Sequence, residues 1–261
     1  MFANLNLFNT EKEERMGARE YWFAVKERLK AVEEDISAIQ NAARVIYTAL
    51  KAGRRVFIFG CAHSVILAEE MFYRAGGLVF WNPIHAPGLT MDTRPISYTT
   101  YVERLEGYGR VIVERSEIGK GDILIIVSTS GRNPVPVEAA LAAKEKGATV
   151  IALTSLEYSQ NVQSRHSSGK KVYEIADIVL DNHAPFGDAS VEVPERGLKY
   201  GAVSGILGIY ILRAIEAEII DCMLQEGWEP PVFRSSNLPT ITSDEHNRRL
   251  IEQYRNQITY E

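Results

Sequence analysis

Short, wholly apolar segments alternate with helix-like segments through the middle of the chain, and this alternation constrains the fold more than any other feature. The clearest apolar segment is DILIIV at residues 122–127, and others lie at residues 55–59, 78–81, 149–153 and 178–180. Such runs are typical of strands buried on both faces of a parallel sheet. Helices are expected at residues 64–75, 97–108, 134–146 and 157–166. The pattern therefore predicts βαβ units and an α/β fold.

Helical periodicity continues on both sides of this region. Residues 10–52 predict two helices, because apolar side chains recur at three- and four-residue spacing. Thr10 is the expected N-cap of the first, with Glu13 completing a capping box. A long apolar helix is expected at residues 197–225 and a charged one at 244–257, whereas 82–94 and 182–196 are expected loops and 111–113 is ambiguous. We expect one domain over residues 1–261, with a helical arm (10–52), an α/β core (54–226) and a C-terminal extension (227–261).

Composition limits the classes of protein and partner that the chain is compatible with. The chain has 46% hydrophobic and 24% charged residues, which is ordinary for a soluble protein. The formal net charge of -5 argues against a nucleic-acid partner, which favours a basic face. The most apolar stretch, residues 200–212, is too short to span a bilayer. No signal peptide is visible, so we expect a cytoplasmic protein without membrane contact. The two cysteines are far apart and show no metal-binding spacing. We expect no metal and no cofactor.

Two strand-to-helix turns carry hydroxyl and small side chains. The first is residues 60–64, GCAHS, and the second is residues 128–133, STSGRN. A helix N-terminus presents unpaired backbone N–H groups and favours an anion, and hydroxyl groups add further donors. The expected phosphate-binding residues are Ser64, Ser128, Thr129, Ser130, Gly131 and Asn133. Each turn alone is equally typical of an ordinary helix cap.

The positions of these turns strengthen the prediction. In a doubly wound sheet of order 2-1-3-4-5, strands one and three are neighbours, and ligands bind between their carboxyl ends. The two turns follow those two strands, so they are expected to converge on one ligand. Neither a G-x-G-x-x-G nor a G-x-x-x-x-G-K-[ST] nucleotide motif is present.

At these residues the chain resembles the SIS (sugar isomerase) domain family. The matching segments are FIFGCAHS at 57–64, DILIIVSTSGRNPVPVEAA at 122–140, ATVIALTS at 148–155 and ADIVLDN at 176–182. The resemblance covers roughly residues 35–225, and the tail is similar to that of a bacterial subgroup named after phosphoheptose isomerase. It implies a three-layer α/β/α sandwich with a five-stranded parallel sheet of order 2-1-3-4-5. It also implies a phosphorylated sugar as partner and a homodimer or homotetramer with shared sites.

The chain departs from the family pattern at two positions. Ala62 stands where the first turn often has a second glycine, and His63 precedes the serine. Arg74 stands where phosphoheptose isomerase has a catalytic glutamate, while Glu69 and Glu70 lie about one helical turn earlier. The resemblance therefore leaves the specific isomerase activity open.

Aldose–ketose isomerisation needs a base and a group that polarises the carbonyl. The candidate catalytic residues are His63, Glu70, Glu69 and Glu103, the last in a segment that could lie over the pocket. His63 is also compatible with a polar cap, and Glu69 and Glu70 with a solvated helix face. The candidate pocket-loop residues are His85, Asn182, His183 and Asp188. We expect a sugar-phosphate-binding protein that is an isomerase. The alternatives are a non-catalytic sugar-phosphate sensor, an amino-sugar phosphate isomerase or etherase-type lyase, and an oligomer with a vestigial pocket.

Overall fold

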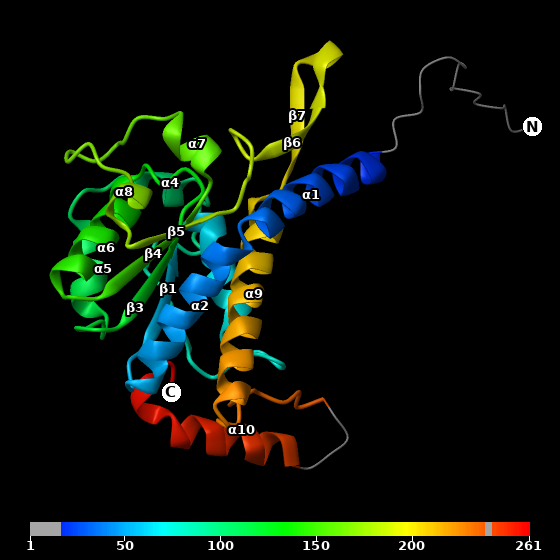
Figure 1. Ribbon diagram of the computed structural model, residues 1–261. Helices are drawn as coiled ribbons and strands as arrows, with labels where there is room; N and C mark the ends of the chain where they lie inside the picture. The colour runs from blue at the N-terminus through cyan, green and yellow to red at the C-terminus, as the bar shows by residue number, and fades with distance from the viewer. Residues whose placement is uncertain (1–16, 238–241) are drawn as a thin grey trace, which may run out of the picture.

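A five-stranded parallel sheet in the order β2-β1-β3-β4-β5 forms the centre of the computed structural model, which describes residues 17–237 and 242–261 (Figure 1). The strands are β1 Val56–Gly60, β2 Trp81–Ile84, β3 Ile123–Val127, β4 Thr149–Thr154 and β5 Ile178–Asp181. All four neighbouring pairs are parallel. The predicted α/β fold and its strand order are therefore confirmed.

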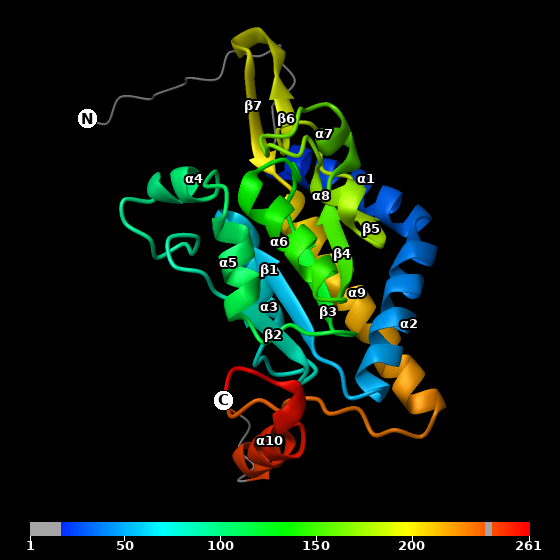
Figure 2. The same ribbon diagram turned by 90° about the vertical axis from the view of Figure 1, so that its left-hand side faces the viewer.

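Side chains alternate between the two faces of the sheet. Val56 and Ile58 pack in one apolar cluster, while Phe57 and Phe59 pack in another on the opposite face. The first cluster is covered by α1 Gly17–Glu34, α2 Ile36–Lys51, α3 Val65–Met71 and α9 Ser204–Gln225. The second is covered by α5 Tyr108–Arg115, α6 Pro134–Glu145 and α8 Val172–Ile175 (Figures 1 and 2). This confirms the expected three layers.

Helix α9 packs closely on α3, the helix that follows the first turn. A Cβ atom added at Gly208 would lie 2.4 Å from Leu67 Cδ2, so a larger residue would require the Leu67 side chain to shift. Buried Glu216 of α9 accepts hydrogen bonds of 2.7 Å from the Leu78 N–H and the Trp81 indole. These contacts fix α9, α3 and the segment before β2 relative to one another.

The second strand lies three residues later than predicted, at Trp81–Ile84. Residues 78–80 are buried, as their apolar character requires, but they do not pair with β1. Their backbone turns instead to the C-terminal extension: the Val79 N–H donates to Pro231 O at 3.1 Å, and Leu78 bridges Val232. Burial by the tail, rather than by the sheet, explains the misplaced prediction.

Three predicted helices differ from the structure. Residues 97–108 form α4 Tyr98–Val102 and the start of α5, separated at Gly107 with φ 91°, and α5 takes in the ambiguous residues 111–113. Helix α7 is only Leu156–Gln160. Residues 197–203 are not helical, because β6 Ala189–Val193 and β7 Leu198–Ala202 form an antiparallel hairpin that projects from the body beside α1 (Figure 1). Gly201 has φ 76°, a value that a right-handed helix does not contain, and it packs against Tyr21.

The two ends of the chain border the core differently. The predicted cap at Thr10 and Glu13 lies outside the described residues, while residues 17–51 form the two expected helices. The C-terminal extension forms α10 Thr242–Gln253 and the 3-10 turn Arg255–Gln257, then returns to edge strand β2. There the Asn82 side chain donates to Gln257 O at 3.0 Å and accepts from the Thr259 N–H at 2.7 Å. Within the described ranges, every helix is too short or too polar to cross a membrane.

Candidate functional site

The first turn places Ser64 over the carboxyl end of β1. Residues Ala62–Ser64 form a 3-10 turn directly before α3. A Cβ atom at Gly60 would lie 2.5 Å from Ser64 O, so the absence of a side chain lets the turn fold back tightly. Ala62 has φ 50° and its N–H donates to Leu89 O at 2.8 Å. This left-handed conformation gives a physical reason for the glycine that the family often has there.

The second turn directs its carbonyl groups toward the body of the protein. Thr129 O accepts from the Ser155 N–H at 3.0 Å and from the Thr154 hydroxyl at 3.1 Å. Gly131, with φ 59°, accepts from the Val172 N–H at 2.9 Å. Within the described part of the chain, the N–H groups of Thr129, Ser130 and Arg132 have no acceptor. A turn with free N–H groups at the start of a helix is suited to bind an anion.

A cavity of about 440 Å³ lies between the two turns. Five of the predicted site residues line it, namely His63, Ser64, Thr129, Asn182 and Asp188. The remaining lining comes mainly from α3 and from the end of β7 and the start of α9, with Ile66, Leu67, Val127, Ala202, Ser204, Gly205, Ile206 and Ile209. The other predicted residues of the second turn do not line the cavity; they are Ser128, Ser130, Gly131 and Asn133. The structure thus brings both turns to one cavity.

The wall opposite the turns is the N-terminus of α9. Asp188 accepts hydrogen bonds from the Val203 N–H and from both the N–H and the hydroxyl of Ser204. Asn182 lies beside it, and its side-chain oxygen accepts from the Ala184 N–H at 3.0 Å. Both predicted loop residues therefore line the cavity while their oxygen atoms also hold the loops in place.

His63 lies on the exposed side of the same cavity. Its ring makes no hydrogen bond or ion pair with any residue in the described ranges, in contrast to Asp188 and Asn182. The hydroxyl groups of Ser64, Thr129 and Ser130 are likewise without a partner among residues 17–237 and 242–261. These side chains are therefore available to a ligand.

Glu69, Glu70 and His85 lie away from this cavity. Glu69 Oε1 is 3.5 Å from His85 Nε2, and the pair lines a separate cavity of about 510 Å³. Glu70 forms ion pairs with Arg74 at 3.0 Å and with Arg213 at 3.6 Å. The two adjacent glutamates thus face different neighbours, as expected for consecutive helical positions.

Glu103 lies at the end of α4, against the start of α6. Its backbone oxygen accepts from the Val135 N–H at 3.2 Å. Burial raises the pKa of its carboxyl group, although a hydrogen bond with Asn133 and the charges of Arg104 and Arg165 oppose the shift. Glu103 therefore borders the second turn near Asn133 and is not among the residues that line the cavity.

His183 lies at the helical arm rather than in the cavity. Its Nε2 is 2.9 Å from Asp35 Oδ2, at the junction of α1 and α2, and its Nδ1 is 3.5 Å from Asp181 Oδ2. The residue has φ 52°, and its carbonyl oxygen accepts from Arg28 at 2.9 Å. These contacts join the arm to the end of β5.

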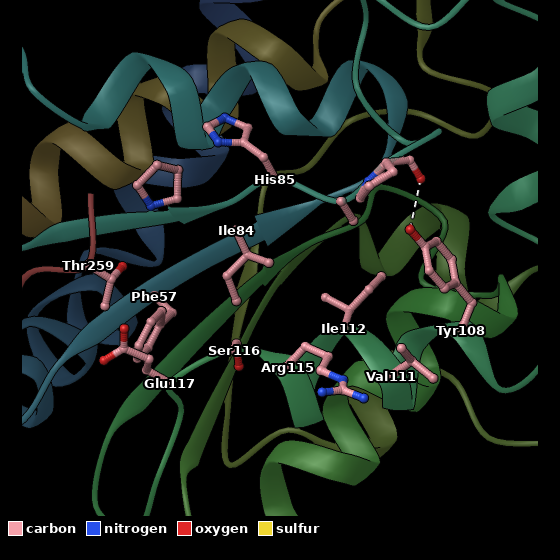
Figure 3. Close-up of a pocket in the computed structure, with 13 residues that line it drawn as sticks. Phe57, Ile84, His85, Tyr108, Val111, Ile112, Arg115, Ser116, Glu117 and Thr259 are labelled. Carbon is pink, nitrogen blue, oxygen red and sulfur yellow. Dashed lines mark hydrogen bonds between the residues drawn. The ribbon is translucent and has the colours of Figure 1, made fainter. Parts of the chain in front are cut away.

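A further cavity of about 480 Å³ lies beside β2, α5 and the returning C-terminal segment (Figure 3). Phe57, Ile84 and Ile112 contribute apolar surface, and Tyr108 closes one side by donating to Pro87 O at 2.8 Å. It lies along the flank of the sheet. In doubly wound folds, ligands bind at the carboxyl ends of the strands where the strand order reverses, which favours the cavity at Ser64 and Thr129.

Two features of the site were missed from the sequence. Ser204 begins α9 at the cavity wall, but the expected helix began at residue 197, so this position read as helix interior. The Ser-Gly pair at 204–205 was the available signal for a helix start. Arg165 also borders the second turn, where its N–H donates to Arg132 O at 2.8 Å. Among the described residues, no group of three or more His, Cys, Asp or Glu side chains is arranged to hold a metal ion.

Comparisons with known proteins agree with this architecture. Residues 20–155 match the model of the SIS domain family. A UPF0309 protein of Shouchella clausii is 43% identical over 242 residues, covering 92% of this chain and 98% of the relative. A UPF0309 protein of Caldanaerobacter subterraneus subsp. tengcongensis is 44% identical over 237 residues, covering 90% of this chain and 94% of the relative.

Two solved structures share the fold. A phosphoheptose isomerase from Francisella tularensis aligns with a TM-score of 0.50 at 16% identity, covering 77% of this chain and 95% of the other. The Vibrio vulnificus NanR protein complexed with ManNAc-6P aligns with a TM-score of 0.50 at 14% identity, covering 91% of this chain and 69% of the other. The family match and the sequence relatives together show that the chain belongs to the SIS domain family, among the UPF0309 proteins.

Proposed function

We propose that this protein binds a phosphorylated sugar in the cavity between the two turns. The observation that carries the proposal is the convergence of Ser64 and Thr129, from different strand-to-helix turns, on one cavity at the ends of β1 and β3. The N–H groups and hydroxyls of Thr129 and Ser130, which have no partner in the described chain, suit a phosphate group. Membership of the SIS domain family supports this ligand class.

We further propose that the bound sugar is isomerised, with His63 as the acid–base group. A base must lie within hydrogen-bond reach of the carbon-bound proton that it moves. His63 lines the cavity next to the phosphate turn and has no other partner among the described residues. Asp188 is less suited to this role, because three hydrogen bonds already occupy its carboxylate.

A cytoplasmic homo-oligomer with shared sites belongs to the same proposal. Ile66 and Ile206, which line the cavity, are 38% and 43% exposed, so apolar side chains at the cavity reach the surface. A second copy covering these side chains would exclude water from the site and contribute further side chains to the ligand.

The second candidate is a non-catalytic sugar-phosphate sensor. It is favoured by the scarcity of acid–base groups: among the described residues that line the cavity, His63 is the titratable side chain that no hydrogen bond commits. NanR, a protein of the same fold, is complexed with ManNAc-6P in its solved structure. Amino-sugar isomerase or etherase-type chemistry remains a variant of the first proposal.

Calorimetric titration of variants tests the phosphate cradle. Ser64→Ala, Thr129→Val and Ser130→Ala are each expected to weaken binding of a sugar phosphate about tenfold, the effect of removing a hydrogen bond to a charged group. Ser97→Ala, at an exposed serine without a side-chain hydrogen bond in the described chain, is the matched control. Unchanged affinity in all three variants would contradict the cradle.

Turnover of the sugar phosphate that binds best separates the two candidates. An isomerase is expected to lose activity in His63→Gln while keeping its affinity, because the imidazole would be needed only for proton transfer. Binding without turnover in the unmodified protein would select the sensor.

A further inference from the structure

Three arginines gather beside the second turn, and we call them the arginine cluster: Arg104, Arg132 and Arg165. The Arg165 N–H donates to Arg132 O at 2.8 Å, and its Nη1 donates to Asn133 Oδ1 at 2.9 Å. Asn133 is the N-cap of α6, a helix of 12 residues. The cluster therefore lies at a helix N-terminus, where the backbone already carries partial positive charge.

The cluster holds more positive than negative charge. Glu103 is the carboxylate that acts on Arg165, and it offsets one of the three guanidinium groups. Burial, and then repulsion from Arg132 and Arg104, lowers the pKa of Arg165. Gathering like charges in this way costs free energy unless an anion binds among them.

The Arg132 side chain has hydrogen-bond donors without an acceptor among the described residues. Its Nε is buried and has no acceptor, and its side chain makes no hydrogen bond or ion pair with any residue in the described ranges. The side chain of Arg104 is equally without such a partner there. Buried donors are almost always paired, so an acceptor from outside these residues is expected. Guanidinium groups bind carboxylate and phosphate oxygens in bidentate fashion, which fits an anionic oxygen group.

We propose that the arginine cluster binds a second anionic group of the ligand, so that the preferred ligand is a sugar phosphate bearing a further carboxylate or phosphate. This inference rests on the proposed function, because it extends the same ligand from the cavity along the second turn. Thr129 lines the cavity and Arg132 follows three residues later, so at most about 10 Å of chain separates the two positions. This spacing is compatible with a single sugar derivative that carries one phosphate and one further anionic group.

Paired ligands test the preference by calorimetry on the full chain. Fructose 1,6-bisphosphate is compared with fructose 6-phosphate, and 6-phosphogluconate with glucitol 6-phosphate. The doubly anionic member of at least one pair is expected to bind tenfold or more tightly, as expected for hydrogen bonds between charged groups. The first pair reports a second phosphate and the second pair a carboxylate, so the two sources are distinguished. Equal affinities within both pairs would overturn the inference while leaving the proposed function intact.

Variants of the cluster locate the effect. Arg132→Gln and Arg165→Gln are each expected to reduce the preference to near one and to change affinity for the singly phosphorylated member less than threefold. Arg248→Gln, an exposed position on α10 at the other end of the molecule, makes the same charge change as a control (Figure 1). Equal losses for both members of a pair would show that the arginines serve the first phosphate and would overturn the inference. Failure of every ligand to bind would overturn the proposed function and the inference together.

Discussion

The carboxylate of Asp188 holds Ser204 at two points: Oδ1 accepts from the Ser204 N–H at 2.8 Å, and Oδ2 accepts from the Ser204 hydroxyl at 2.7 Å. The pair fixes the start of α9 at the cavity wall opposite the two strand-to-helix turns. Asp188 itself has φ 69°, a left-handed conformation that aspartate and asparagine tolerate better than most residues. The wall of the cavity therefore depends on one loop residue for its position.

Removing this contact should loosen α9. Asp188→Ala is expected to lower the free energy of unfolding by about 1–2 kcal/mol, because it deletes the acceptor at a helix N-terminus. Asp188→Asn keeps an acceptor and tolerates the same φ, so it should cost about 0.5 kcal/mol. Urea denaturation of both variants checks the order. Equal losses would mean that the carboxylate does not cap α9.

Gly60 should be irreplaceable at the first turn. In Gly60→Ala the new methyl group would lie 2.5 Å from Ser64 O and 2.6 Å from Ser64 C, and backbone atoms cannot move aside cheaply. We expect a loss of about 2 kcal/mol in stability and weaker sugar-phosphate binding, because Ser64 must shift. Gly119→Ala is the control, since its Cβ would meet its nearest neighbour, Asp122, at 3.8 Å. Similar urea midpoints for the two variants would contradict the close approach.

The parts of the fold that follow local patterns were predictable from the sequence. Residues 123–127 are buried without exception, and such an apolar run is typical of a central parallel strand. The strand order followed from the resemblance to the SIS domain family. Residues 78–80 look the same in sequence but pair with the tail, through contacts such as Val79 with Pro231. Apolar character records burial and not the partner that provides it.

The candidate site was predictable where it depends on one turn and unpredictable where it depends on side-chain direction. Ser64 and Thr129 follow directly from the ends of β1 and β3. The hairpin that precedes Ser204, and the pairing of His183 with Asp35 across 148 positions, depend on long-range packing. No local spacing encodes such contacts, which explains why His183 was expected in the cavity loops and lies at the arm.

The His183–Asp35 contact should contribute to stability and not to binding. A double-mutant cycle with His183→Ala and Asp35→Ala is expected to give a coupling free energy of about 1 kcal/mol, the usual value for one hydrogen bond. Affinity for sugar phosphates should be unchanged in His183→Ala, because the residue does not line the cavity. Additive effects on unfolding, or a large loss of affinity, would contradict this role.

Glu103 should make stability depend on pH. Because its pKa is raised, chiefly by burial, the folded protein holds this proton more tightly than the unfolded chain. Its contribution to stability therefore falls as the pH rises through the ordinary carboxyl range and above. Relative to Glu103→Gln, the unmodified protein is expected to lose stability as the pH rises above the ordinary carboxyl pKa of about 4. Denaturant titrations across this range measure the difference.

Asp177 is the control of opposite sign. Burial raises its pKa, but hydrogen bonds from Lys144 and the Val150 N–H outweigh this effect and leave the pKa lowered. Relative to Asp177→Asn, the unmodified protein should therefore gain stability as the pH rises over the acidic range. The same slope for both comparisons would contradict the assignment for Glu103.

The binding of a phosphorylated sugar between Ser64 and Thr129 is tested most directly by a thermal-shift comparison of sugar phosphates with the same sugars lacking phosphate. A ligand that binds only the folded state raises the melting temperature. We predict a concentration-dependent rise with one or more phosphorylated members and none with their unphosphorylated counterparts, and we predict that Thr129→Val reduces the rise. Equal shifts with both forms of each sugar, or no shift with any, would contradict the account.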